Sequence, residues 1–299
     1  MKKIVTRGEV VMSQGLHTEG QTSLLEVYFR ESAQPGTDEF TLRLANVLLM
    51  RITGSTHSDW EIGESIQGST SSDTATIENK KQLGDGSTML KLSGISESEV
   101  FSIGETVTGQ TSGASGAVDN SVMSLSSLAD SNFQINEEIV DQSTGASADI
   151  KGSHVEVLEL NNINGTFGLN NTIVGQESGA SAVVSSHYAG VPGMFTSDTV
   201  SEIVGEASNY TPPTLSAGST DWATLDTGLD GNAYIQTREI TIDASGGDLG
   251  PINTLILTVN IDGGEEEIVS SGPIKSAPPS EVITSGGSLT LTYQQKIAN

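Results

Sequence analysis

The sequence predicts an all-β fold in which a discontinuous antiparallel β-sandwich is interrupted by an array of about four small β-rich repeats. Three observations indicate this fold. The 299 residues include 34 glycines, and short runs of Ile, Val and Leu are separated by Gly, Asn, Asp and Ser. An 18-residue pattern recurs four times in the middle of the chain. The flanking segments alternate apolar and polar residues, as half-buried antiparallel strands do.

The N-terminal segment contains the first expected strands. The runs SLLEVYFRE (23–31) and EFTLRLANV (39–47) are rich in strand-forming residues and are joined by the turn-rich SAQPGTD. Two strands are too few to form a stable domain. We therefore expect residues 1–45 to join residues 190–299 in one discontinuous sandwich.

The inserted segment, residues 46–189, carries four ungapped copies of the 18-residue pattern. Each copy has an aromatic residue at position 1 and aliphatic residues at positions 7 and 18, so the two aliphatic anchors are always eleven positions apart. A packed hairpin requires such constant spacing, whereas a disordered linker does not. The copies are residues 60–77, 101–118, 133–150 and 167–184. The anchors are Trp60, Phe101, Phe133 and Phe167 at position 1, Ile66, Val107, Ile139 and Ile173 at position 7, and Ile77, Val118, Ile150 and Val184 at position 18.

Three further positions of the pattern predict local structure. Position 3 is Ile or Leu, which predicts that it shares one face of a strand with the aromatic residue. Position 4 is always Gly or Asn, which predicts a turn with a left-handed backbone. Position 5 is acidic in three copies, at Glu64, Glu105 and Glu137, and repetition favours a turn or a rim over a single active site.

An alternating run follows or precedes each copy, such as VLLMRITG from Val47 and MLKLSG from Met89. We expect each copy and its run to form a bead of three or four strands and ~30 to 40 residues, which would be too small to be stable alone and would stack on its neighbours. An insertion of this kind is tolerated at a surface loop, because closing a long loop adds little entropic cost.

The C-terminal segment reads as a series of strands separated by turns. The expected strands include NAYIQTREITID (232–243), INTLILTVNID (252–262) and GSLTLTYQQKI (287–297), with Gly-rich turns between them. The spacing of the turns is typical of a sandwich or a partly closed barrel.

The charge of the chain excludes some partners. There are 38 Asp and Glu residues against 13 Lys and Arg, which gives a formal net charge of −25. Such a surface repels phosphate backbones and anionic lipids, so we expect neither nucleic-acid binding nor membrane insertion. The sequence has no cysteine and no apolar run that could span a membrane, and its start does not read as a secretory signal. We expect a soluble protein that is synthesised in the cytoplasm.

Catalytic residues are not expected. The histidines His17, His57, His154 and His187 lie far apart without metal-ligand spacing, which favours surface or turn positions. No Gly-x-Ser-x-Gly motif stands between a strand and a helix. Paired carboxylates, as in glycoside hydrolysis, are the one enzymatic route left open. We expect no enzyme activity and no cofactor.

Two acidic turns are candidates for cation binding. Asp226, Asp230 and Asn232 in LDTGLDGNAY carry side-chain oxygens that could bind Ca²⁺, but they lack a full twelve-residue loop, which favours an ordinary Asp-Gly turn. The GGEEE run (263–267) is expected to be a solvated hairpin tip.

The repeat pattern GE-x-V-x-G-x-T-SGA-x-A-x-V resembles repeats found in virion structural proteins of tailed phages. The flanks are similar to a family of phage tail or tail-fibre β-sandwich proteins, through LEVYFRES, SEIVGEASNYTPP (201–213), REITIDASGGDLGPINTLILT and GSLTLTY. One position departs from the family pattern, because Tyr210 is followed by Thr211 and Pro212 where an Arg is usual two positions after the tyrosine.

The resemblance implies a non-enzymatic virion structural protein of the phage tail, which would be a fibre, baseplate or tail-tip component. It implies partners among the other virion proteins, a homo-oligomer that is trimeric or sixfold, and host attachment through a surface glycan. Three alternatives remain open. They are a capsid decoration or head-fibre protein, a glycan-binding or glycan-degrading tailspike, and a bacterial adhesin built from the same repeats.

Overall fold

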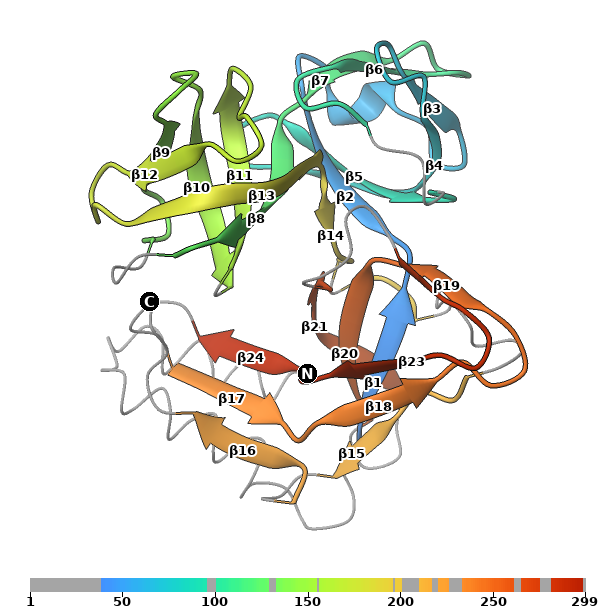
Figure 1. The fold of residues 1–299 in the computed structure, drawn as a ribbon. Coiled ribbons are helices and arrows are strands. Elements are labelled where there is room, and N and C mark those ends of the chain that lie inside the picture. The colour runs from blue at the N-terminus through green and yellow to red at the C-terminus, as the bar shows by residue number, and fades with distance from the viewer. Residues whose placement is uncertain are drawn as a thin grey trace.

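The protein consists of two small β-barrels on a β-sandwich-like base, as the computed structural model shows (Figure 1). The structure describes residues 39–95, 101–128, 133–154, 156–195, 197–200, 210–216, 220–225, 233–260, 265–274 and 281–297. Over these ranges the chain is all-β, and the one helical element is a short 3₁₀ turn, η2 (His57–Asp59). The predicted strand 23–31 lies outside the described residues. No helix in the described ranges is both long and apolar enough to cross a membrane.

The first barrel is a closed ring of six antiparallel strands. The order is β2-β5-β4-β3-β6-β7, and a pairing between β7 and β2 closes the ring. Its strands are β2 (Leu48–Thr53), β3 (Ser65–Gly68), β4 (Thr74–Gln82), β5 (Thr88–Ser93), β6 (Thr106–Gly109) and β7 (Ser115–Val118).

The second barrel repeats this topology strand for strand. Its closed order is β8-β11-β10-β9-β12-β13, so each strand corresponds to the strand six places earlier in the chain. Its strands are β8 (Asn120–Ser126), β9 (Glu138–Asp141), β10 (Ser147–His154), β11 (Val157–Asn164), β12 (Thr172–Gly175) and β13 (Ser181–Ala189).

Each barrel contains two copies of the repeat, related by an approximate two-fold axis. The copies meet through antiparallel pairs in which position 8 faces position 8, at Gln67↔Thr108 in the first barrel and Val140↔Val174 in the second. The prediction that each of the four copies forms a separate bead is therefore wrong. The physical reason is that one hairpin buries only one face, and two facing hairpins with two linking strands enclose a complete core.

The anchor residues of the repeat form the centres of the two barrel cores. Every predicted anchor at positions 1, 7 and 18 has an exposed fraction of 5% or less. Copies 1 and 2 pack with β2 and β5 in one cluster, and copies 3 and 4 pack with β8 and β11 in another.

Local structure at the start of each copy confirms one prediction and corrects another. Gly63, Gly104, Asn136 and Asn170 at position 4 all have positive φ, as predicted. The expectation that position 3 lies on a strand face is wrong, because positions 1 to 5 form a turn before the first strand of each hairpin. Ile62 and Leu169 at position 3 are consequently 60% and 61% exposed.

The base is a β-sandwich-like unit of two layers. One layer is the sheet β15-β1-β20-β21, in which β1 lies beside strands from the C-terminal segment. The other layer is a long antiparallel ribbon in which β17, β18 and β19 pair in turn with β24, β23 and β22, and β16 extends it at one end. The strands are β1 (Glu39–Ala45), β15 (Thr214–Ser216), β16 (Trp222–Leu225), β17 (Ala233–Thr237), β18 (Ile240–Asp243), β19 (Leu249–Ile252), β20 (Thr254–Asn260), β21 (Glu266–Pro273), β22 (Glu281–Ile283), β23 (Ser288–Leu291) and β24 (Gln294–Ile297).

The core of the base lies between these layers. Phe40 on β1 meets Trp222 on β16 edge to face, with ring centroids 5.4 Å apart. Both residues belong to one buried cluster that includes Ile240 and Ile242 of the ribbon and Leu257 of β20.

The barrels are inserted between β1 and the rest of the base. Two residues separate the end of β1 from the start of β2, where the insertion begins. The chain returns as β14 (Val191–Pro192), which pairs antiparallel with β2. At the exit point the Asn253 Oδ1 accepts a hydrogen bond from the Val47 N–H at 3.0 Å, and the Thr254 hydroxyl donates to the Val47 carbonyl at 3.0 Å. The entry and exit strands of the insertion thus lie side by side.

Candidate functional site

Buried carboxylates join the two copies within each barrel. In the first barrel, Glu105 of copy 2 accepts backbone N–H bonds from Thr70 and Ser71 of copy 1 at 2.9 and 3.0 Å, and a hydroxyl bond from Ser71 at 2.8 Å. It also accepts the N–H of Ser102, in its own copy, at 2.6 Å. Three of these four charge-assisted hydrogen bonds therefore hold the two hairpins together, and the fourth fixes the carboxylate within its own copy.

Glu64 of copy 1 makes the reciprocal set of bonds. It accepts the backbone N–H groups of Thr111 and Ser112 at 3.3 and 3.0 Å, the Ser112 hydroxyl at 2.9 Å, and the Glu61 N–H of its own copy at 2.6 Å. The polar contacts between the copies therefore have the same approximate two-fold symmetry as the strands. We refer to Glu64, Glu105, Glu137 and Asp141 as the inter-repeat carboxylates.

A glycine at position 9 of the facing copy makes room for each glutamate. A Cβ atom built on Gly68 would lie 2.6 Å from a Glu105 carboxylate oxygen, and one on Gly109 would collide with Glu64. These glycines are therefore required by a close approach of side chain to backbone, and not by a left-handed conformation.

Each barrel has two such contacts between its copies, and we call each contact a junction. The second barrel has one junction of the same type as the first barrel and one altered junction. Glu137 of copy 3 accepts the N–H groups of Glu177 and Ser178 of copy 4 at 3.3 and 3.0 Å, next to Gly175. At the other junction, copy 4 carries Asn171 at position 5, and copy 3 carries Asp141 at position 9. The carboxylate is then supplied by the opposite copy.

Asp141 occupies the place that a glutamate takes elsewhere. It accepts the N–H groups of Ser143 and Thr144 at 2.8 and 3.0 Å, the Gly168 N–H at 2.9 Å and the Asn171 amide at 2.9 Å. These backbone donors are at positions 11, 12 and 2, the positions whose N–H groups bind the glutamates at the other junctions.

The inter-repeat carboxylates are buried. Glu64, Glu105 and Glu137 end the turn formed by positions 1 to 5, as expected for a turn position, but their side chains do not lie at an exposed rim. Their exposed fractions are 5%, 6% and 0%, and that of Asp141 is 0%. Burial acts to raise the pKa of Asp141, but the bonds from Asn171, Gly168, Ser143 and Thr144 outweigh it and lower the pKa to about 2. For Glu64 and Glu105, hydrogen bonds likewise outweigh burial and lower the pKa.

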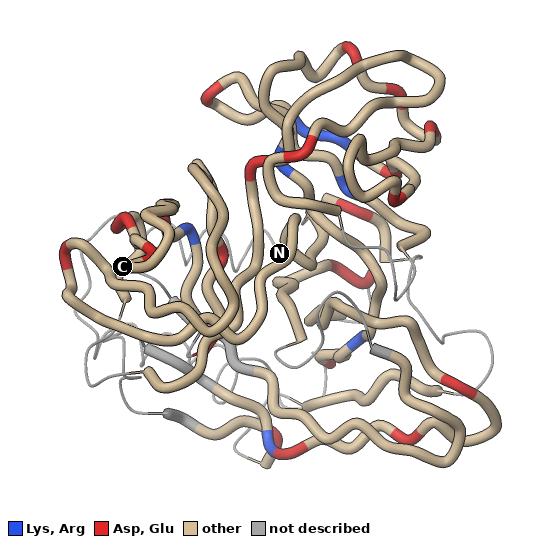
Figure 2. Tube along the Cα trace, turned by 45° about the horizontal axis from the view of Figure 1, so that its top comes forward, with Lys and Arg blue, Asp and Glu red and all other residues tan. Residues whose placement is uncertain are grey.

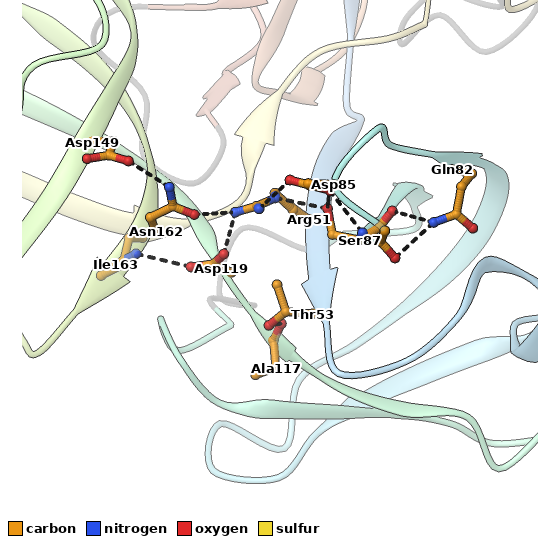
Figure 3. A network of polar contacts seen from close by, with 11 residues as sticks. Arg51, Thr53, Gln82, Asp85, Ser87, Ala117, Asp119, Asp149, Asn162 and Ile163 are labelled. Carbon is orange, nitrogen blue, oxygen red and sulfur yellow. Dashed lines mark hydrogen bonds and ion pairs between the residues drawn. The ribbon is translucent and has the colours of Figure 1, made fainter.

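A second polar site joins the two barrels, and it centres on Arg51 of β2 (Figure 3). The Arg51 guanidinium donates to Ser87 at 3.1 Å, Asp85 at 2.7 Å and Asn162 at 3.1 Å, and it forms a short ion pair with Asp119. These residues are the Arg51 cluster. Because Asn162 lies on β11 and Asp119 lies between β7 and β8, the cluster spans the boundary between the barrels.

Asp119 connects both sides of this boundary. One oxygen pairs with Arg51 and the other accepts the N–H of Ile163 from the second barrel at 3.0 Å. Burial raises the pKa of Asp119, while the Ile163 N–H and the charge of Arg51 oppose that rise. Hydrogen bonds from Ser87 and Arg51 hold the pKa of Asp85 well below its usual range.

Lys91 on β5 is the two-fold counterpart of Arg51 in the first barrel. The strands LLMRIT and TMLKLS have the same burial pattern, and each places a buried cation at its fourth residue. Lys91 lies 3.5 Å from Asp198, on the segment that returns toward the base, and both side chains are almost fully buried. Asn79 also donates to Asp198 at 2.7 Å. The first barrel therefore has two equivalent cations, of which Arg51 contacts the second barrel and Lys91 contacts the segment that returns toward the base.

The positions equivalent to these cations in the second barrel are Ser124 and Glu159. Figure 2 shows that acidic residues are spread over both barrels and the base, whereas much of the basic charge lies on the first barrel. Sequence reasoning missed Arg51 and Lys91. The available signal was a single basic residue at the same place in two otherwise apolar runs.

The remaining predicted site residues are placed as follows. The Ca²⁺ candidates Asp226, Asp230 and Asn232 lie outside the described residues. Within the described part, no group of three His, Cys, Asp or Glu side chains could hold a metal ion. The GGEEE run is not simply a solvated tip, because Glu266 forms a two-pronged ion pair with Arg43 at 2.8 and 2.7 Å.

His187 differs from the expected surface or turn histidine. It lies on β13, where its Nε2 is 2.8 Å from the Ser121 hydroxyl and its ring meets Phe167 edge to face. Burial lowers the pKa of His187 to about 4. Ser121 is fully buried, so this Ser–His pair is closed to a substrate.

Comparisons of the chain with known protein families, curated protein sequences and solved structures give no match.

Proposed function

We propose that the protein is a non-enzymatic structural component of a tailed-phage virion, located in the tail as part of a fibre, baseplate or tail tip. In this proposal the base attaches to other virion proteins. The two barrels form an arm that projects from the particle toward the host surface. Copies of the chain assemble around a threefold or sixfold axis through the base.

The observation that carries this proposal is the way in which the three units are held together. The second barrel is fixed to the first by the Arg51 cluster, and the first is fixed to the base by Asn253 and by the buried Lys91–Asp198 pair. Buried ion pairs and bidentate contacts restrict the angle between units more than an exposed linker does. A stiff arm supports a role as a spacer or contact surface.

The resemblance of the repeats and flanks to phage structural proteins supports the same role. The net charge of −25 supports contacts with proteins or neutral glycans over contacts with nucleic acid. The large aromatic anchors Trp60, Phe101, Phe133 and Phe167 are used in the barrel cores, so they do not form an exposed sugar-binding platform. This favours assembly over glycan degradation as the main activity.

Immunogold electron microscopy of purified particles tests the location. Antibodies are raised against the second barrel, residues 120–189, and pre-immune serum serves as the control. We expect label on the tail. Label on the capsid shell would instead support a decoration or head-fibre protein, and particles without label would overturn both. Release of sugars from host polysaccharide by the purified protein would contradict the non-enzymatic role.

A further inference from the structure

We infer that Asp141 and Asn171 determine which repeats pair, so that copies 3 and 4 form the second barrel only with each other. The chain carries four hairpins of closely similar sequence, and two barrels of identical topology. Any two hairpins could in principle form a barrel. The altered junction of the second barrel provides a chemical rule that selects one combination.

The rule follows from a pocket that holds one carboxylate. At each junction the backbone N–H groups of positions 2, 11 and 12 converge on one acid, as at Glu105 with Ser102, Thr70 and Ser71. Backbone N–H groups arranged in this way bind a single anion. At the altered junction the same donors, from Gly168, Ser143 and Thr144, bind Asp141.

A glutamate at position 5 of one copy leaves no room for a side chain at position 9 of the facing copy. A Cβ atom on Gly68 or Gly175 would lie 2.6 or 2.5 Å from the facing glutamate oxygen. If a copy with Glu64, Glu105 or Glu137 at position 5 faced Asp141, two carboxylates would enter one buried pocket. Like charges at this separation are strongly unfavourable in a buried site.

The opposite mismatch is also unfavourable. Asn171 is shorter than Glu and uncharged, and its amide donates to both oxygens of Asp141. Opposite a glycine at position 9, it would leave the converging N–H groups without their carboxylate, and an unsatisfied buried donor is costly. Copy 3 therefore rejects copies 1, 2 and 3, and copy 4 accepts copy 3.

Gly168 at position 2 is part of the same adaptation. A Cβ atom on Gly168 would collide with the Asn171 amide, whereas copies 1 to 3 carry Glu61, Ser102 and Gln134 at this position. Three coupled differences, at residues 141, 168 and 171, thus distinguish this junction. Selective pairing matters here because tandem repeats and neighbouring chains in an oligomer readily exchange similar elements.

The test uses the full chain with Asn171→Glu, Asp141→Gly and the double variant. We expect each single variant to lower the melting temperature of the second barrel by roughly 10 °C, because one overfills the pocket with charge and the other empties it. The double variant recreates the glutamate–glycine junction and should recover most of this loss. Gln176→Glu is the matched control, because it adds the same charge to an exposed position of copy 4, and it should leave the melting temperature unchanged.

Pairing selectivity is measured by refolding each protein from denaturant at high concentration and determining the dimer fraction by light scattering. The double variant should form several-fold more exchanged dimer than the natural chain, although its stability is restored. Failure of the double variant to recover stability would overturn the shared pocket. Recovery with an unchanged dimer fraction would overturn the role of these residues in partner choice.

Discussion

At the scale of single residues, the main feature is a charged group in a buried site that is stable because every oxygen is hydrogen-bonded. Desolvating a carboxylate is costly, and bonds from backbone N–H groups compensate for that cost. Glu137 shows this hydrogen bonding clearly, since it is fully buried and accepts bonds from Gln134 of copy 3 and from Ser178 of copy 4.

Glu137→Ala should therefore destabilise the second barrel by about 3 kcal/mol, because several backbone donors lose their acceptor together. Chemical denaturation followed by circular dichroism measures this change. The matched control is Glu138→Ala, since Glu138 is the next residue and is exposed. An equal effect of the two substitutions would contradict a special role for the buried carboxylate.

Acid should destabilise the protein in two stages. The pKa of His187 is lowered to about 4 in the folded state, so the unfolded chain binds the proton first, and stability falls as the pH drops from about 6.5 toward 4. The pKa values of Glu64, Glu105 and Asp141 are also lowered by folding. Their contribution is present above the unfolded pKa values of about 4 to 4.5 and is lost as the pH falls below them, and for Asp141 this loss continues toward pH 2.

Melting temperatures recorded from pH 8 to pH 2 test this order. His187→Gln should remove the decrease between pH 6.5 and 4 and leave the steeper decrease below pH 4. A natural protein with constant stability down to pH 4 would show that His187 does not titrate as the structure indicates.

At the scale of elements, strands β2 and β5 have two roles. Their inward side chains, such as Met50 and Leu90, complete the core of the first barrel, while Arg51 and Lys91 point outward into contacts with neighbouring units. A buried cation on the outside of a barrel is favourable only where a partner covers and pairs with it. The same strand thereby builds one barrel and orients the next.

Arg51→Met should loosen the joint between the barrels while both remain folded. Asp119 would lose its ion pair in a partly buried site, at a cost of about 3 kcal/mol. Calorimetry should then show the second barrel unfolding separately, and small-angle scattering should show a broader distribution of distances.

Arg238→Met is the matched control, because Arg238 also pairs with an aspartate but is about half exposed. Exposed pairs contribute about 0 to 1 kcal/mol, so this substitution should change little. A single unaltered transition for Arg51→Met would contradict the proposed joint.

At the scale of the whole molecule, the barrels form an insertion whose ends meet. Strand β14 pairs with β2 where the insertion begins, with Val191 opposite Leu49. A segment with adjacent ends can be removed or replaced with little strain on the host domain. The base has its own core, which includes Phe40, Trp222 and Ile240.

Replacing residues 48–192 with a short Gly/Ser linker should therefore leave a folded base. Circular dichroism should show β structure with a cooperative thermal transition. In the proposed function, this variant should still attach to particles and should lack the projecting arm in electron micrographs. An aggregated or unfolded product would show that the base depends on the barrels.

The amino-acid sequence alone determined the all-β class, the four repeats and the residues at the centre of each repeat. Alternation and spacing are local properties, so Ile66 and Ile77 could be assigned to a hairpin core without knowledge of its partner. The left-handed turn at Gly63 or Asn136 was predictable for the same reason, because it depends on the backbone of one residue.

Only the tertiary structure decided that the hairpins pair into two barrels and that acidic side chains lie between them. Copies 1 and 2 are joined through Glu64 with Ser112 and Glu105 with Ser71, which are contacts between residues more than thirty positions apart. An exposed acidic turn and a buried one have the same sequence. The difference lies in the N–H groups that another segment brings to the carboxylate, and local patterns carry no information about that segment.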